Sequence, residues 1–193
     1  MLQRLSHETT TKLIKNAPST RLRPTPIRAL ITANLGIYAF YHLQAGPTKV
    51  RMTKNFAVEP ESGPQSLLTY HFFHKTAAPL AFNLAVLATV GSSVCMHVGN
   101  ARFLRLLALG AAGSSLCAAA NIRNDASACV TGGLGLSASM ITYSYFASPA
   151  RLATLHLSPA LWAPALLSYA FVCNDKSVVG GVLAGWTAFL ICL

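Results

Sequence analysis

Charged residues, and acidic residues above all, are scarce in this chain. Of 193 residues only 10% are charged and five are Asp or Glu, whereas 53% are hydrophobic. Soluble domains of this size have about a quarter charged residues, so the shortage indicates a membrane protein. The net charge of +10 does not form a basic stripe with interleaved aromatics. We therefore expect no nucleic-acid partner.

Metal-binding and redox motifs are missing as well. The five cysteines all fall in apolar stretches, none forms a C-x-x-C pair, and none lies beside a histidine cluster. His71 and His74 are three residues apart, but no third ligand accompanies them. We expect neither a metal site nor a cofactor, and we interpret the two histidines as structural hydrogen-bonding groups.

Residues 1–26 form a basic tail that lacks the apolar core of a secretory signal peptide. The tail is rich in Ser and Thr, and it contains five Lys or Arg residues against one acid, Glu8. This composition is typical of a mitochondrial targeting segment. An ordinary cytosolic basic tail is the alternative.

Six apolar segments follow the tail, each near the ~20 residues that cross a hydrocarbon core as a helix. They are predicted at 27–43, 67–95, 102–120, 128–147, 152–173 and 177–193. Residues 27–193 are therefore expected to form an all-α, six-span membrane domain. Its one long connection, 44–66, contains three prolines and two glycines and is predicted to be a loop.

Lys and Arg are divided unevenly between the two sides of this topology. The side of the N-terminus carries nine of them, six within residues 1–28, and the opposite side carries six. The positive-inside bias places both termini on the cytosolic or matrix side. Combined with the targeting-like tail, this predicts a multi-pass protein of the mitochondrial inner membrane with both termini in the matrix.

Two patterns in the second and third apolar segments resemble a known family. In LLTYHFFHKTAAPLAFN, Thr69 is followed by His74 and, nine residues after that histidine, by Asn83. This spacing resembles the second span of rhomboid intramembrane proteases. Gly91 and Gly99 then resemble the turn of that family into its third span.

Two glycine motifs closer to the C-terminus extend the resemblance. Gly133-Leu-Gly135-Leu-Ser137 falls where the rhomboid nucleophile motif is expected, in the fourth span. Gly181 and Gly185 match the glycines of the last span, where a small-xxx-small face lets helices approach closely. Because the four motifs occur in the family's order, the resemblance implies the six-helix rhomboid bundle.

A rhomboid protease, as the resemblance implies, uses a serine in the fourth span and a histidine in the sixth. The serine needs such a base, because a neutral hydroxyl is a weak nucleophile. The histidine position, three residues before Gly181, holds Val178, and no histidine follows His156 in the sequence. The expected base is therefore absent.

The nucleophile position has two possible registers. If Gly133 begins the motif, which its place in a glycine pair favours, Gly135 stands at the serine position. If Gly135 begins the motif, Ser137 takes that position. The second-span histidine that helps to hold the oxyanion in the family is replaced by Pro79, whereas Asn83 remains. We assign no catalytic residue.

The sequence thus predicts a rhomboid pseudoprotease that acts as an accessory subunit of a mitochondrial inner-membrane complex. That complex could be the respiratory chain, ATP synthase or a protein translocase. Other subunits and membrane lipids, including anionic lipids such as cardiolipin, are the expected partners. Two alternatives stay open: a Derlin-like client-binding protein of the endoplasmic reticulum, and an active intramembrane serine protease with an unusual base.

Overall fold

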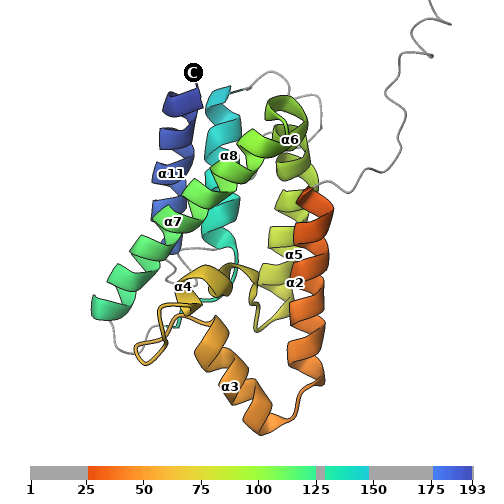
Figure 1. The fold of residues 1–193 in the computed structure, drawn as a ribbon, viewed down its shortest axis with the longest axis vertical. Helices are drawn as coiled ribbons and strands as arrows, with labels where there is room; N and C mark the ends of the chain where they lie inside the picture. The colour runs from red at the N-terminus through yellow and green to blue at the C-terminus, as the bar shows by residue number, and fades with distance from the viewer. Residues whose placement is uncertain (1–25, 125–128, 148–175, 193) are drawn as a thin grey trace, which may run out of the picture.

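The computed structural model describes residues 26–124, 129–147 and 176–192. In these ranges most residues are helical, and the longer helices run up and down past one another as a bundle (Figure 1). The targeting-like tail before residue 26 and the predicted span 152–173 lie outside the described residues. The count of six spans therefore remains a prediction.

The first predicted span is helix α2, Pro26–Leu43. It begins with proline, whose fixed φ suits the first helical position and whose missing N–H has no helical partner there. The start of α2 and the end of α11, Ser177–Cys192, lie at the same end of the bundle (Figure 1).

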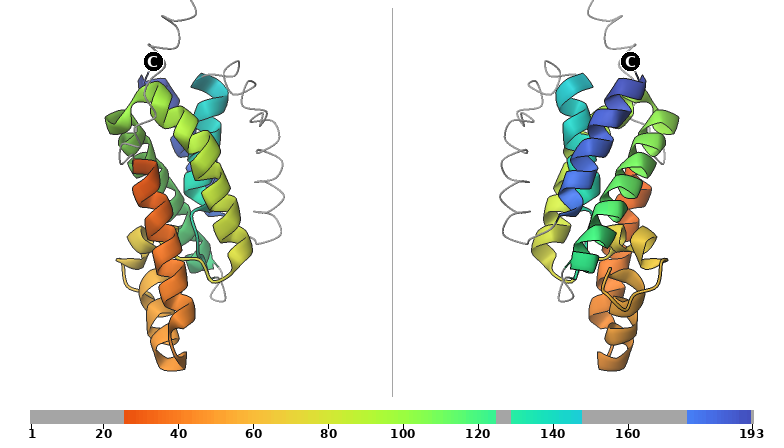
Figure 2. Two further views of the ribbon diagram at one scale, coloured as in Figure 1. Left: turned by 90° about the vertical axis from the view of Figure 1, so that its right-hand side faces the viewer. Right: turned by 90° about the vertical axis from the view of Figure 1, so that its left-hand side faces the viewer.

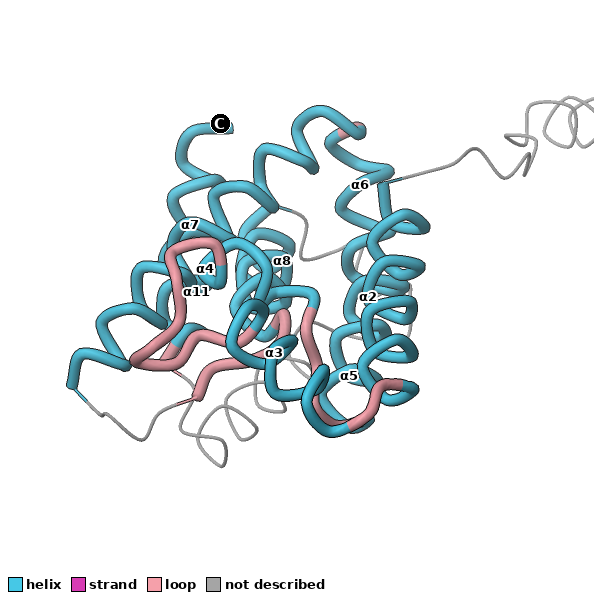
Figure 3. Tube along the Cα trace, turned by 60° about the horizontal axis from the view of Figure 1, so that its bottom comes forward, coloured by secondary structure: helices cyan, strands magenta, loops and turns pink. Residues whose placement is uncertain are grey.

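The segment 44–66 is not irregular throughout, which corrects the predicted loop. Helix α3, Gly46–Phe56, occupies half of it and has proline in its first turn, where no helical hydrogen bond is lost. Helix α3 buries Met52 and carries three basic side chains. It lies at the end of the bundle opposite to the start of α2, where the connecting loops also gather (Figure 3).

The second predicted span begins later than residue 67. Short helix α4, Ser66–Thr69, and the 3-10 turn η1, Tyr70–Phe72, precede it. The spanning helix then runs continuously over Ala77–Val98. Its parts are α5, Ala77–Val86, a π-helical turn η2, Leu87–Gly91, and α6, Ser92–Val98.

A sharp turn at Gly99 separates this helix from α7, Asn100–Asn124. The φ of Gly99 is +81°, a conformation that glycine adopts without steric penalty. Among the described residues, Ala77–Val98 and Asn100–Arg123 are the two helices long and apolar enough to cross a membrane, and Ser177–Ile191 is a shorter apolar helix.

The fourth predicted span is shorter than expected, because α8 covers only Leu134–Ala147. The residues before it are extended: Val130 and Val58 exchange two backbone hydrogen bonds of 3.0 Å. Helices α7, α8 and α11 then pack together, and α2 lies along the α5–η2 stretch (Figure 2). A single apolar core joins these helices, with fully buried Val86, Phe103 and Met140 near its centre.

Candidate functional site

The expected nucleophile motif begins in the extended segment that leads into α8. At Gly132 the chain turns with φ +93°, which only glycine adopts easily, and the Gly132 N–H donates to the Tyr70 carbonyl at 2.9 Å. Together with the pairing of Val58 and Val130, this bond fixes the segment against η1 and the end of α3. The first turn of α8 is thereby held in one position.

A charged cluster closes the outer side of the same segment. The Lys75 ammonium lies 3.4 Å from the Glu59 carboxylate and donates to Cys129 Sγ at 3.0 Å, while the Cys129 thiol donates to Glu59 at 3.1 Å. Burial raises the pKa of Cys129, so at neutral pH the group is a protonated thiol. The cluster therefore joins three loops and contains no thiolate nucleophile at neutral pH.

His74 packs on the inner side of the glycine pair. Its ring is buried, and Nε2 accepts a long hydrogen bond of 3.4 Å from the Gly133 N–H. Burial lowers the pKa of His74 to about 4, so the imidazole is neutral at physiological pH. Because its acceptor nitrogen faces the Gly133 amide, His74 supports the loop before α8.

His71 and Thr69 connect the same region to α7 and α3. His71 Nε2 lies 3.2 Å from Ser115 Oγ, and Ser115 donates to the Leu67 carbonyl at 2.6 Å. Burial lowers the pKa of His71 to about 4 as well. Thr69 Oγ1 donates to the Asn55 carbonyl at 3.0 Å. These bonds are structural ties between segments 14 to 48 residues apart in sequence.

Ser137 belongs to a buried chain of polar side chains that crosses three helices. Its hydroxyl, fully buried, donates to Asn83 Oδ1 at 2.9 Å. The Asn83 amide donates to Asn34 Oδ1 at 3.3 Å, and the Asn34 amide donates to the Leu30 carbonyl at 2.8 Å. The Ser137 hydroxyl therefore donates to a neutral amide oxygen, which is not a base that can remove its proton.

Gly135 faces the opposite way, towards α7 and α11. A Cβ added at Gly135 would overlap the Ser114 side chain and lie 3.0 Å from the Ser177 carbonyl oxygen. In return, a Cβ on Gly181 would overlap the Gly135 carbonyl. The position that the favoured register gives to the serine thus lies beside the turn of α11 that contains Val178, and a side chain there would collide.

The two registers differ in which helix the candidate residue faces. Positions 135 and 137 are separated by roughly 200° around α8. Gly135 faces α11, where the family would hold its histidine, and Ser137 faces α5. Among the described residues, no group of three His, Cys, Asp or Glu side chains comes together as a metal site.

The other motif glycines are packing and turn positions. A Cβ on Gly91 would lie 3.2 Å from Ile27 and 3.3 Å from Met140, so this glycine lets α2 and α8 close on η2. Gly185 lies against the Ser139 backbone. Pro79 occupies the first turn of α5, where its missing N–H breaks no helical bond.

Sequence reasoning did not single out Asn34 or Ser114. Asn34 had a signal, since an amide within an apolar span needs a polar partner. Ser114 had none, because its part in the site is only to fill the space beside Gly135.

The long apolar helices indicate a helical membrane protein, and the four sequence motifs all lie within its helix bundle or in the turns that lead into it. A family model for the rhomboid domain matches residues 62–192, well over half of the chain. The chain therefore belongs to the rhomboid family. A search of curated proteins found no match.

Proposed function

We propose that this rhomboid-family membrane protein is catalytically inactive and serves as an accessory subunit of a mitochondrial inner-membrane complex. The observation that supports inactivity most directly is the pair of positions on α8 and α11. Val178 stands at the histidine position, and Gly135 at the serine position is packed against Ser114 and Ser177. In this register the two positions therefore hold neither the nucleophile nor the base of the family.

The shifted register does not supply a better dyad. Ser137 is held by Asn83 on the side of α8 that faces away from Gly181. A serine needs an adjacent base within hydrogen-bonding reach to attack a peptide carbonyl. The buried amides of Asn83 and Asn34 are neutral at all accessible pH values, so they stabilise the bundle and do not activate the hydroxyl.

The accessory role is supported by what the bundle leaves exposed. Helix α3 stands at one end with Val50 and Arg51 exposed, and α11 exposes Leu183, Trp186 and Leu190 along its length. Such outer faces can contact other subunits or lipid. The mitochondrial location is supported by the composition of residues 1–26, and both termini would then lie in the matrix.

The test is migration of the tagged full-length protein on a native gel after extraction in mild detergent. We expect the protein in the mitochondrial membrane fraction and in a band far above its monomer mass of 20.5 kDa. Mass spectrometry of that band would name the complex. A population found only at monomer mass contradicts the subunit role, and recovery in endoplasmic reticulum membranes contradicts the location.

A further inference from the structure

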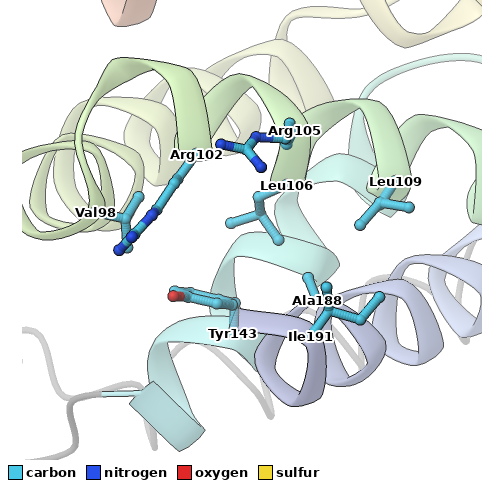
Figure 4. Close-up of a pocket in the computed structure, with 8 residues that line it drawn as sticks. All are labelled: Val98, Arg102, Arg105, Leu106, Leu109, Tyr143, Ala188 and Ile191. Atoms are coloured by element: carbon cyan, nitrogen blue, oxygen red, sulfur yellow. The ribbon is translucent and has the colours of Figure 1, made fainter. Parts of the chain in front are cut away.

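A small cavity opens at the end of the bundle where α6 turns into α7. It lies between α7, α8 and α11 and has a volume of about 70 Å³ (Figure 4). Two arginines, Arg102 and Arg105, and the side chain of Tyr143 line it together with apolar side chains. The apolar lining includes Leu106, Leu109 and Ile191.

The charged groups gather at one end of this cavity, where Val98 also lies. Figure 4 shows Arg105 extending towards Arg102, with the Tyr143 hydroxyl at the same end. Leu109 and Ile191 line the other end. The cavity therefore offers cationic donors at one end and a hydrocarbon-like wall at the other, which is the division that a phospholipid itself has.

The charged and apolar groups follow one another along α7 in the same order as the headgroup and acyl chains of a phospholipid across one leaflet. Arg102 lies in the first turn of α7, near the Gly99 turn that ends the preceding span. Leu109 follows seven residues later, which places it about 10 Å further along the helix axis. The arginines are thus at headgroup level when α7 spans the bilayer, and Leu109 is at acyl-chain level.

No carboxylate of the described residues neutralises the two arginines. The ion pairs among the described residues are Lys54–Glu61 and Lys75–Glu59, and both lie at the end of the bundle opposite to the cavity. Arg102 and Arg105 are exposed and take part in neither. Residues 1–26 are themselves basic, so that part of the chain does not complement the site.

We propose that this cavity binds one anionic phospholipid of the surrounding bilayer. Its phosphate lies between Arg102 and Arg105, because guanidinium groups donate two parallel hydrogen bonds to phosphate oxygens. Part of one acyl chain enters the cavity against Leu106 and Leu109, and the remainder lies along the outer surface. This inference rests on the membrane location in the proposed function and not on the subunit role.

The experiment is native mass spectrometry of the purified full-length protein in mild detergent. Phosphatidylglycerol and phosphatidylcholine with the same acyl chains are added at equal concentration. We expect one phosphatidylglycerol to stay bound and phosphatidylcholine to bind at least tenfold more weakly. Equal retention of the two lipids by the wild type contradicts the proposal without any variant.

Two matched double variants each remove two positive charges, one variant at the cavity and the other at the opposite end of the bundle. Arg102→Gln with Arg105→Gln is expected to weaken phosphatidylglycerol binding roughly thirtyfold. Arg51→Gln with Arg123→Gln removes the same charge from exposed side chains at the other end and should leave binding unchanged. If both double variants lost phosphatidylglycerol binding equally, net charge alone would explain the binding, and the proposed site would be wrong.

Two further experiments distinguish binding of a phospholipid from binding of a simple anion such as phosphate. Leu109→Trp keeps both arginines but fills the apolar end, so it should also weaken phosphatidylglycerol binding. Inorganic phosphate at millimolar concentration should not displace the lipid. Undiminished lipid binding by Leu109→Trp, or displacement by phosphate, would overturn the acyl-chain contact. Because this readout does not involve other subunits, its failure is distinguishable from failure of the native-gel test.

Discussion

At the scale of single residues, Asn83 joins its own helix to α8, to α2 and to the loop before α8. It accepts from Ser137 on α8, donates to Asn34 on α2, and lies against the Gly133 backbone. A polar side chain inside an apolar bundle is costly unless it is paired, and here each amide finds a partner. Asn83, at the position that helps to stabilise the oxyanion in rhomboid proteases, thus links α5 to α8 and α2 through hydrogen bonds.

Removing Asn83 should destabilise the protein more than removing Ser137. Ser137→Ala removes one interhelical hydrogen bond, which costs about 0.6 kcal/mol on average inside membranes. Asn83→Ala leaves the Ser137 hydroxyl without its acceptor and Asn34 Oδ1 without its donor, and should cost about 1–3 kcal/mol. Thermal unfolding in detergent measures the order, with exposed Thr187→Ala as the control. A larger loss for Ser137→Ala than for Asn83→Ala would contradict this linking role of Asn83.

Restoring a serine at position 135 should destabilise the bundle. The new side chain would collide with Ser114 and crowd the Ser177 carbonyl, and overpacking of this kind costs about 1–3 kcal/mol. Gly36→Ser on α2 is the matched control, because a Cβ there meets nothing within 4 Å. The measurement is the unfolding temperature of each variant in detergent, and we expect a lower value for Gly135→Ser than for Gly36→Ser. Equal stability of Gly135→Ser and the control would show that the serine position is open after all.

Lowering the pH should weaken the fold through His74. Its pKa is lowered by burial from 6.5 to about 4, so between these values the unfolded chain binds a proton that the folded chain does not. Stability is therefore lost as the pH falls from about 6.5 to about 4. His74→Gln should flatten this decline in melting temperature, whereas exposed His42→Gln should not. Equal slopes for wild type and His74→Gln would contradict burial of a neutral imidazole.

At the scale of elements, length and apolar character predicted the spanning helices well. Helix α2 begins one residue before its predicted start at 27, whereas the spanning helix Ala77–Val98 begins ten residues after the predicted start at 67. Helix α3 was missed because its proline and glycine indicate loops, yet both lie in its first turn, where they are tolerated. The late start of α8 depends on the pairing of Val58 with Val130, a contact 72 residues apart that no local pattern shows.

The candidate site was predictable in part for the same reason. The small-residue spacing of Gly181 and Gly185 predicted close helix approach there, and Gly181 does lie against the Gly135 backbone of α8. The partners of Ser137 could not be predicted, because Asn83 is 54 residues away and Asn34 lies on a third helix. Local spacing fixes which residues share a helix face, and only tertiary packing decides what faces them.

The turn at Gly99, between the two long apolar helices of the described residues, gives a prediction at this scale. Gly99→Ala should destabilise by about 1–3 kcal/mol, because φ +81° with ψ 162° is a conformation almost confined to glycine. A Cβ at Gly99 meets nothing within 4 Å, so the loss would come from the backbone alone. Gly46→Ala, equally open but at the start of α3, is the control. No difference between the two variants would contradict the strained turn.

At the scale of the whole molecule, the positions that correspond to the family's catalytic residues in the favoured register, Gly135 and Val178, lie in closely packed parts of the bundle. Glycines of α7, α8 and α11 lie in backbone contact, Ser137 is bonded to Asn83 on α5, and His74 supports the loop before α8. These motif residues thus have structural contacts. We infer that the fold is retained for its surfaces and not for peptide-bond hydrolysis.

The most direct test is an intramembrane cleavage assay with the purified wild-type protein and its Ser137→Ala variant in proteoliposomes. Transmembrane substrates and a serine-directed fluorophosphonate probe are presented to both, with an active rhomboid protease as the positive control. We predict neither cleavage nor labelling by the wild type. Cleavage or labelling that the wild type performs and Ser137→Ala does not would contradict the account.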